Sequence, residues 1–297
     1  MARAPDRFGV LPVDKPSGPT SHDVVAAARR SLRLAKVGHA GTLDPFATGL
    51  LLLLLGRATR LAEYLLVLPK RYNATLRLGA ATDSDDRTGA VIHSSEGWRE
   101  LDEAEVRAVF RTQLGDTLQL PPRFSAKKVG GERSYRAARR GRELERRPAR
   151  VTIHRLEVTG VRLPEVDFEV DCSAGTYVRA IARDVGDALG VGGHLTALRR
   201  TSVGDIGLGG ALPPSQLEDP EAVERALIPP RAALGHLPAH RLDPEQAGRV
   251  SHGREAPLFP EPELPEGSPV VLLAPDGSFL AVGERRADRL LPGKVFA

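Results

Sequence analysis

Apolar and polar positions alternate in short blocks along the first part of the chain, and each block predicts one element. Residues 8–13 predict a short strand, and residues 22–33 carry an apolar stripe at helical spacing. Thr20 or Ser21 can cap that helix. The six leucines at 50–55 are too few and too uniformly apolar for a surface helix. We therefore expect a strand buried on both faces, or a short buried helical segment leading into one.

In the middle of the chain, apolar residues recur at helical spacing in some segments and at every second position in others. Residues 58–69 predict a helix ended by its final proline, and residues 70–79 alternate like a half-buried strand. Residues 101–115 predict a second helix that ends at a glycine. Residues 165–190 predict a strand, a sharp glycine turn and a helix, and residues 194–207 predict extended structure.

The residue composition changes toward the C-terminus. Five prolines occur in the thirteen residues 257–269, and Asp276-Gly277 lies between two apolar runs, which predicts a β-hairpin. We therefore expect a larger domain at residues 1–235 and a small, separate β domain at residues 236–297. The fold class that this organisation favours is α+β with a β appendage.

Composition limits the class of protein only broadly. A chain of 297 residues with 41% hydrophobic content can bury a substantial core. The single cysteine, Cys172, excludes an intrachain disulfide and fits a reducing compartment. The N-terminus has no apolar stretch of signal-peptide length, and the leucine run is far shorter than the roughly 18–20 residues of a membrane span. We expect a soluble, cytoplasmic protein without a membrane partner.

Positive charge is concentrated in one segment. Between Arg123 and Arg150 there are eleven Lys or Arg and three Glu, a local net charge of +8. The whole chain carries +4, so the remainder carries −4. A basic segment on a slightly acidic body indicates a polyanion site. A solvated, arginine-rich helix face is the alternative, and the charge alone does not decide between them.

The segment 38–49, GHAGTLDPFATG, places a single carboxylate between a glycine-rich turn and the leucine run. Glycines let a backbone approach a ligand closely. A desolvated carboxylate such as that of Asp44 is a good covalent catalyst. The plainer alternative is an Asx-type turn residue before Pro45, and the local sequence alone favours that alternative. No zinc-spaced Cys/His cluster, P-loop or dinucleotide fingerprint accompanies the segment.

The segment nevertheless resembles the catalytic motif of the bacterial tRNA pseudouridine-55 synthases, the TruB-type family. Further segments are similar to that family's signatures, in its order and roughly its spacing: DKPSGPTS at 14–21, KRYNATLRLGAATDSDDRTG at 70–89, PPRFSAKKVGGERSYRAAR at 121–139, CSAGTYVRAIARDVG at 172–186 and HLTALRR at 194–200. LLPGKVF at 290–296 is similar to the end of the family's small RNA-binding domain, of the PUA type. The resemblance covers nearly the whole chain, and six motifs in order are far more specific than any one of them.

The resemblance implies the fold and the reaction. The fold is the pseudouridine synthase core, a mixed and mainly antiparallel central sheet with flanking helices, followed by a small C-terminal β-barrel PUA-like domain. The reaction isomerises uridine to pseudouridine at position 55 in the T-loop of tRNA. The essential aspartate of the family falls on Asp44, acting on a uridine that is flipped out of the folded loop. An isomerisation consumes no oxidant, group donor or metal, so we expect no cofactor. Whether Asp44 attacks the sugar or the base is left open.

Further site residues follow from the same resemblance. Tyr72 matches the tyrosine that packs on the target base and is a candidate general base, and Arg179 matches the arginine that keeps the aspartate ionised. Tyr177 and Leu198 match residues that bind the substrate, and His39 matches a histidine that helps to hold the flipped-out nucleotide. For each residue a structural role is the alternative: a strand aromatic, an ion pair at a helix start, plain core or a loop histidine.

A second set of residues is expected to support the site rather than to react. Lys15 and Pro16 match a motif that supports the catalytic loop, and Gly41 belongs to the loop itself. The acidic segment TDSDDR at 82–87 holds three carboxylates in four residues and could bind Mg²⁺. We interpret it instead as a turn, with Asp86 at a position that the family uses for pairing or RNA contact.

The basic segment is expected to bind RNA phosphates as an insertion at about 116–150. Its candidate contacts are Lys127, Lys128, Arg133, Arg136, Arg139 and Arg140. Neutralising several of them should weaken RNA binding and flatten its salt dependence, because fewer counterions are then released. Unchanged affinity and an unchanged salt slope would contradict this prediction.

Three hypotheses remain open on the sequence. The first is a stand-alone enzyme, expected to be a monomer without an obligatory protein partner, whose partner is the tRNA T-stem-loop. The second is a tRNA-binding RNA chaperone that does not require catalysis. The third is a guide-RNA-dependent pseudouridine synthase. Asp44 with Tyr72 and Arg179 favours an enzyme, and activity of the protein alone on a bare stem-loop would separate the first hypothesis from the third.

Overall fold

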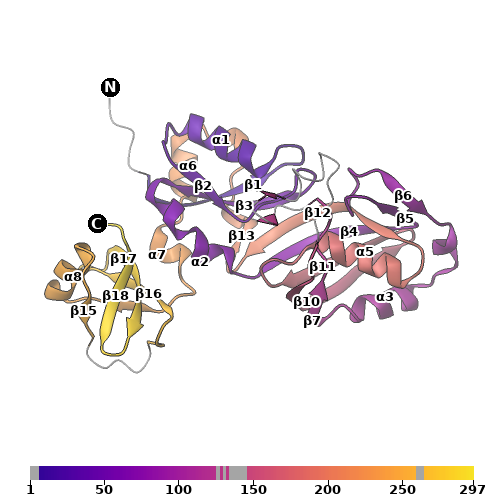
Figure 1. The fold of residues 1–297 in the computed structure, drawn as a ribbon. Coiled ribbons are helices and arrows are strands. Elements are labelled where there is room, and N and C mark those ends of the chain that lie inside the picture. Colours follow the sequence, from indigo (N-terminus) through magenta and orange to yellow (C-terminus); the bar gives the residue numbers. More distant parts are fainter. Residues whose placement is uncertain (1–6, 125–127, 130–131, 134–145, 259–263) are drawn as a thin grey trace.

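The computed structural model describes residues 7–124, 128–129, 132–133, 146–258 and 264–297. A long central sheet forms most of the molecule, and a smaller C-terminal sheet lies at one end of it (Figure 1). No helix in the described ranges is long and apolar enough to cross a membrane.

The central sheet is mainly antiparallel. Its strands are β1 (Gly9–Lys15), β2 (Val37–Ala40), β3 (Thr48–Leu55), β4 (Lys70–Leu78), β7 (Gly115–Gln119), β10 (Ala149–Arg162), β11 (Glu165–Cys172), β12 (Gly193–Val203) and β13 (Ile206–Gly207). They follow the order β1-β3-β12-β4-β11-β10-β7, with β2 paired to β3 and β13 paired to β12. β12 and β3 form the one parallel pair among these described strands. The resemblance implied this mixed sheet.

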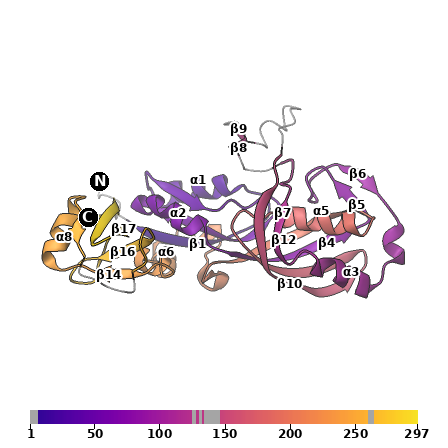
Figure 2. The same ribbon diagram turned by 60° about the horizontal axis from the view of Figure 1, so that its bottom comes forward.

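Helices and short hairpins surround the sheet. The helices of this part are α1 (Ser21–Ser31), α2 (Ala62–Leu66), α3 (Glu103–Arg111), α5 (Val178–Ala188), α6 (Pro220–Ala226) and α7 (Pro230–Ala233), with short 3₁₀ turns at Gly56–Leu61, Gly97–Glu100, Leu208–Gly210 and Pro214–Gln216. Two hairpins pair β5 (Ala80–Thr82) with β6 (Val91–Ser94) and β8 (Lys128–Val129) with β9 (Glu132–Arg133). α3 and α5 lie side by side against the central strands in both ribbon views (Figure 2).

The leucine run forms β3, and both of its faces are buried as the sequence predicts. Leu51, Leu53 and Leu55 belong to the core under α1, whereas the alternate residues Leu50, Leu52 and Leu54 belong to a second core. Successive side chains of a strand point to opposite faces, so a uniformly apolar run suits a strand between two cores. β3 therefore gives the preceding loop a rigid support.

Two local predictions change in the structure. The helix expected at 58–69 divides into the 3₁₀ turn Gly56–Leu61 and the short helix α2, which ends at Leu66. The proline at the end of this segment disfavours helical structure before it. Of the two candidate caps, Thr20 is the N-cap of α1, in a capping box with Asp23.

The C-terminal sheet is joined to the body by a shared core. Its elements are β14 (Ala239–Arg241), α8 (Pro244–Ser251), β15 (Ala256–Pro257), β16 (Pro269–Leu273), β17 (Phe279–Arg286) and β18 (Arg289–Val295). The Phe8 ring stacks on the Phe296 ring with 5.2 Å between their centroids, and the centroid of the Phe279 ring also lies 5.2 Å from that of Phe296. Arg57 Nη1 donates to the Phe296 carbonyl at 2.5 Å. The contact is therefore both apolar and hydrogen-bonded.

Candidate active site

The loop between β2 and β3 carries Asp44. Its backbone turns there, because the Ala47 amide donates to the Asp44 carbonyl at 3.1 Å. Ser21, the residue after the cap of α1, exchanges hydrogen bonds with the backbone of Leu43 at 2.8 and 3.1 Å. Gly41 adopts a φ of +94°, a conformation that residues with a Cβ rarely adopt. Asp44 thus lies on a loop fastened at several backbone positions.

The Lys15 side chain holds the same loop through hydrogen bonds to its backbone. The side chain is fully buried, and Nζ donates to the carbonyls of Pro16, Pro45 and Ala47 at 2.8, 3.3 and 2.8 Å. Burial lowers the pKa of Lys15 to about 8, and the charge of Arg200 adds to this, while the Asp44 carboxylate acts in the opposite direction. The geometry suits the supporting role expected of Lys15 and Pro16.

Arg179, in the first turn of α5, meets the Asp44 carboxylate through two atoms. Nε lies 3.0 Å from Oδ2, and Nη2 donates to Oδ1 at 3.2 Å. Nη1 lies 3.4 Å from Oδ2 of Asp86 and donates to the Ser84 carbonyl at 2.8 Å. Nη2 also donates to the Phe124 carbonyl at 2.9 Å. The side chain of Arg179 is only 4% exposed, so the whole guanidinium is held in place.

Two opposed effects set the protonation of Asp44. Burial raises its pKa above the usual value, because the charged form loses water, and the nearby Asp86 carboxylate adds to this. The Arg179 guanidinium and the charge of Lys15 lower it again. The side chain is still 35% exposed, so the carboxylate faces an opening that a substrate can enter.

That opening is a cavity of about 260 Å³. Its lining brings together residues that are far apart in the sequence: Gly41, Thr42, Leu43, Asp44, Leu66, Lys70, Tyr72, Ser173, Gly175, Thr176, Tyr177, Val178, Arg179, Leu198 and Arg200. Six of the residues singled out from the sequence are in this set. Pockets of this kind, with convergent polar groups and a shifted carboxyl pKa, are the usual place of an active site.

Tyr72 and Leu198 lie on neighbouring strands of the cavity wall. Tyr72 is 9% exposed on β4, and burial raises the pKa of its phenol, whereas the charge of Arg200 and a hydrogen bond with it lower that pKa. Tyr177 is the N-cap residue of α5, and its amide donates to the Gln119 side chain at 2.8 Å. Three elements of the fold therefore contribute to one cavity.

The structure does not bring every predicted residue to the cavity. His39 lies in β2 opposite Leu53 and is not among the residues that line the cavity, so its contact with a nucleotide stays a prediction. Of the basic set, Lys128 and Arg133 lie on β8 and β9, and their side chains are not described. The others lie outside the described residues: Lys127, Arg136, Arg139 and Arg140.

The sequence places Asp86 in a turn, at a position that the family uses for pairing or RNA contact, and in the structure it is 4% exposed beside Arg179. Its Oδ1 accepts hydrogen bonds from Ser84 and Thr88, so this carboxylate is committed within its own turn. Across the described ranges, no group of three His, Cys, Asp or Glu is placed to hold a metal ion. Arg200 is a residue of the site to which the sequence analysis gave no role, and its contacts are described below.

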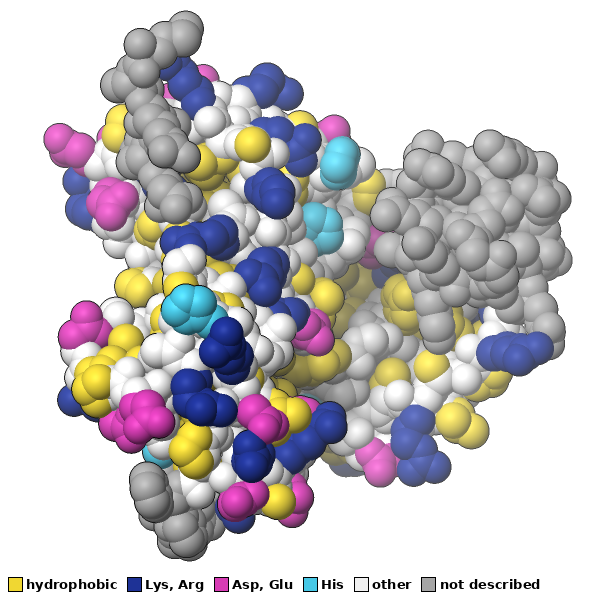
Figure 3. Space-filling model, turned by 60° about the vertical axis from the view of Figure 1, so that its left-hand side comes forward, with side chains coloured by type: hydrophobic (Ala, Val, Ile, Leu, Met, Phe, Trp, Pro, Cys, Tyr) yellow, Lys and Arg dark blue, Asp and Glu magenta, His cyan; other side chains and the backbone are white. Residues whose placement is uncertain are grey.

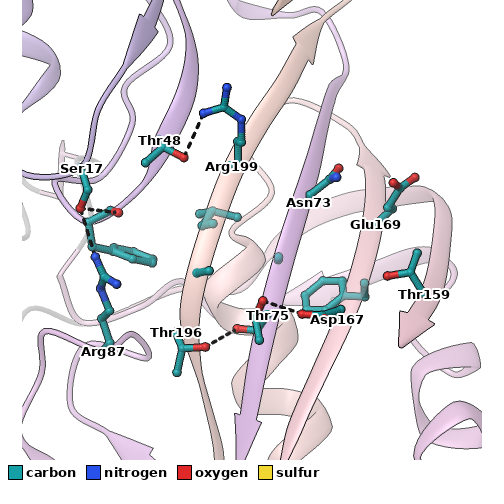
Figure 4. Close-up of a pocket in the computed structure, with 15 residues that line it drawn as sticks. Ser17, Thr48, Asn73, Thr75, Arg87, Thr159, Asp167, Glu169, Thr196 and Arg199 are labelled. Atoms are coloured by element: carbon teal, nitrogen blue, oxygen red, sulfur yellow. Dashed lines mark hydrogen bonds between the residues drawn. The ribbon is translucent and has the colours of Figure 1, made fainter. Parts of the chain in front are cut away.

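A second, more open pocket of about 610 Å³ lies along the same strands, and Leu198 lines both pockets (Figure 4). Asn73 and Thr75 of β4 point into it, as alternation with the inward Tyr72 requires. Thr75 donates to Asp167 at 2.7 Å, and Arg199 donates to Thr48 at 3.5 Å. These hydrogen bonds satisfy many of its polar groups, and the pocket contains none of the proposed reacting side chains.

Comparison with known proteins gives a consistent result. The model of the TruB family pseudouridylate synthase N-terminal domain matches residues 29–178, and that of the tRNA pseudouridylate synthase B C-terminal domain matches residues 179–231. The tRNA pseudouridine synthase B of Thermobifida fusca is 45% identical, over 97% of this chain and 98% of that protein. The enzyme of the same name from Geobacter sulfurreducens is also 45% identical, over 94% of each chain.

Solved structures are similar over the same length. The crystal structure of the archaeal box H/ACA sRNP Nop10-Cbf5 complex contains a chain that matches with a TM-score of 0.76 and 26% identity. The match covers 98% of this chain and 87% of that one. The likeness therefore includes the C-terminal sheet as well as the body.

Proposed function

Because this chain belongs to the TruB family of pseudouridylate synthases, we propose that it isomerises a uridine of tRNA to pseudouridine, at position 55 in the T-loop. The observation that carries this proposal is the cavity in which Arg179 holds Asp44 beside Tyr72. The relatives at 45% identity are named tRNA pseudouridine synthase B, and they align over nearly their full length.

The reaction breaks the bond between uracil N1 and ribose C1′ and forms a bond between C5 and C1′. C5 loses a proton and N1 gains one, so substrate and product are isomers. The Asp44 carboxylate acts on the sugar or on the base, and either role needs it ionised. Arg179 supplies the opposite charge that keeps it so, against the burial that raises its pKa.

The size of the cavity indicates how the substrate enters. About 260 Å³ is at the small end of ligand sites, which suits a single base and not a folded stem. A uridine inside structured RNA must therefore be extruded before Asp44 can reach it. Tyr72 and Leu198 present apolar surface on which the extruded uracil packs.

One face of the molecule suits an anionic RNA. Lys and Arg side chains gather along the middle of the face in Figure 3, beside a hollow that shows hydrophobic side chains. Basic surface of this kind binds the phosphate backbone and leaves sequence selection to other contacts. We propose that this face and the basic segment 123–150 receive the tRNA.

A guide-RNA-dependent synthase is the second candidate, because the archaeal relative is titled as part of a box H/ACA complex with Nop10. The two candidates differ in what the purified chain does alone. We expect it to form pseudouridine at position 55 of an unmodified tRNA transcript, and in a bare T-stem-loop, without added RNA or protein. Position mapping by carbodiimide modification and primer extension gives the answer. Activity only with an added guide RNA would replace the first candidate by the second, and tRNA binding without product would favour a chaperone.

A further inference from the structure

Arg200 is among the largest fully buried side chains of the described residues, with only 1% of its surface exposed. All three of its side-chain nitrogens face backbone carbonyls. Nε donates to Leu50 at 2.7 Å, Nη2 to Gly41 at 3.0 Å and Nη1 to Thr42 at 3.4 Å. One guanidinium therefore connects the start of the Asp44 loop to the strand that follows it.

The strand pairing places Arg200 between two parts of the site. On one side β12 runs parallel to β3, with Arg200 opposite Gly49, and on the other side it pairs with β4, with Arg200 opposite Tyr72. A Cβ on Gly49 would lie only 2.2 Å from the Arg200 carbonyl oxygen. This glycine allows β12 to come close enough for its arginine to reach the loop.

The charge of Arg200 is not neutralised by a carboxylate within ion-pair distance among the described residues. A buried cation without a carboxylate is costly, so its retention beside a cavity needs a reason. The charged and titratable groups that act on Tyr72 are Arg200 from β12, Cys172 from β11 and Asp44 from the loop. Three more line the same cavity: Lys70 of β4, the N-cap residue Tyr177 and Arg179 of α5. Of the influences on the Tyr72 pKa, Arg200 opposes the burial that raises it.

We propose that Arg200 is a positioning residue for the isomerisation: it fixes the Asp44 loop relative to Tyr72, and it places a buried positive charge opposite Tyr72 on the neighbouring strand. The proposal rests on the proposed function only for its kinetic consequence. All three side-chain nitrogens of Arg200 donate to backbone carbonyls, so it is not assigned a reacting role. It acts through the carbonyls that it holds and through the phenol beside it.

The positioning effect is tested with Arg200→Lys, which keeps the charge and loses the planar fork. In single-turnover assays with tRNA we expect the rate constant to fall about 100-fold, because small displacements of a reacting group have effects of that size. The half-saturating tRNA concentration should change by less than about threefold, since substrate contacts remain. Arg199→Lys is the matched control, because Arg199 is adjacent on the same strand, points to the opposite face and pairs with Asp14 at 2.7 Å.

The charge effect is tested with Arg200→Gln, which keeps a donor and removes the charge. The chain has four tyrosines, so 3-fluorotyrosine labelling gives few ¹⁹F signals, and Tyr72→Phe identifies the one from Tyr72. We expect the Tyr72 titration to move to higher pH in Arg200→Gln and to stay near the wild-type position in Arg200→Lys and Arg199→Lys. The titration does not depend on catalysis. If the wild-type protein proved inactive, the proposed function would be rejected, but the effect of Arg200 on the Tyr72 titration could still be measured.

Each outcome decides one part of the proposal. A wild-type rate constant in Arg200→Lys, or an equal loss in Arg199→Lys, would overturn the positioning role. An unmoved Tyr72 titration in Arg200→Gln would overturn the electrostatic role. If Arg200→Lys unfolds below the assay temperature, the rate constant of Arg200→Gln at saturating tRNA is measured instead. We again expect a fall of about 100-fold, and a wild-type rate constant would again overturn the positioning role.

Discussion

At the scale of single residues, one buried arginine forms ion pairs with two carboxylates. Arg179 lies 3.0 Å from Asp44 and 3.4 Å from Asp86, and the Asp86 carboxylate is committed to its own turn while that of Asp44 faces the cavity. The Asp86 carboxylate keeps the guanidinium in place, and the more exposed Asp44 carboxylate faces the cavity, which suits the catalytic role that we propose for it. A charge-assisted contact of this kind holds a catalytic group without covering it.

The pH dependence of Arg179→Gln tests this division of roles. Asp44 must be ionised to act, and Arg179 lowers its pKa against burial. Removing the guanidinium charge therefore raises the Asp44 pKa, and the acid limb of the rate profile should move to higher pH. Tritium release from tRNA labelled at uridine C5, measured from about pH 5 to about pH 8, reports this limb. Arg183→Gln is the control, because Arg183 pairs with Asp85 at 3.1 Å. An acid limb at the wild-type position in Arg179→Gln would contradict the assignment.

The resemblance named most of the residues that the structure brings together, and local pattern could not have named the rest. Asp44, Tyr72, Tyr177 and Arg179 line one cavity, and the roles expected of them stay predictions. Arg200 was missed because two adjacent arginines on a strand do not show which one points inward.

A β-bulge explains why the inward arginine could not be predicted. The register of β12 shifts between Leu195 and Ala197, which resets the alternation so that Leu198 and Arg200 face the cavity. Such a bulge depends on the partner strand, so the sequence of β12 alone does not reveal it.

At the scale of elements, the close approach of β3 and β12 depends on Gly49. It has a φ of +100°, and any Cβ would press on the backbone of Arg200. Gly49→Ala should therefore destabilise the protein by about 3 kcal/mol, combining backbone strain with overpacking. Urea unfolding measures this free energy.

Gly115→Ala is the matched control for that prediction. Gly115 has a φ of +89° but nothing within 4 Å of the position of a Cβ, so only strain applies. We expect a loss of about 1 kcal/mol there. Equal losses at the two glycines would show that the contact with β12 is unimportant.

At the scale of the whole molecule, the C-terminal sheet is held to the body by aromatic rings and by arginines of the 3₁₀ turn Gly56–Leu61. Arg57 Nη1 donates to the Phe296 carbonyl at 2.5 Å, and Arg60 lies over the Phe296 ring at 4.8 Å. Lys294 Nζ donates to the Arg60 carbonyl at 2.6 Å. These contacts give the sheet a defined orientation relative to the cavity, and such preorganisation lowers the cost of binding a partner that contacts both parts.

Arg57→Ala should therefore distinguish long from short substrates. We expect the half-saturating concentration of full-length tRNA to rise about tenfold, equivalent to about 1.4 kcal/mol. That of a bare T-stem-loop should stay unchanged, because we expect only the longer RNA to reach the C-terminal sheet. Arg249→Ala is the control, because Arg249 donates to Glu255 at 2.8 Å within the C-terminal part. A similar rise with both substrates would mean that Arg57 acts on the cavity and not through the sheet.

The most direct measurement is single-turnover release of tritium from an unmodified tRNA transcript labelled at uridine C5, with Asp44→Asn beside the wild type. We expect release at position 55 from the wild-type protein and a rate constant lower by about 10⁴-fold or more in Asp44→Asn. Asp14→Asn is the control, since Asp14 pairs with Arg199 away from the cavity, and it should retain wild-type release. Wild-type release from Asp44→Asn would show that the carboxylate held by Arg179 is not the catalytic group.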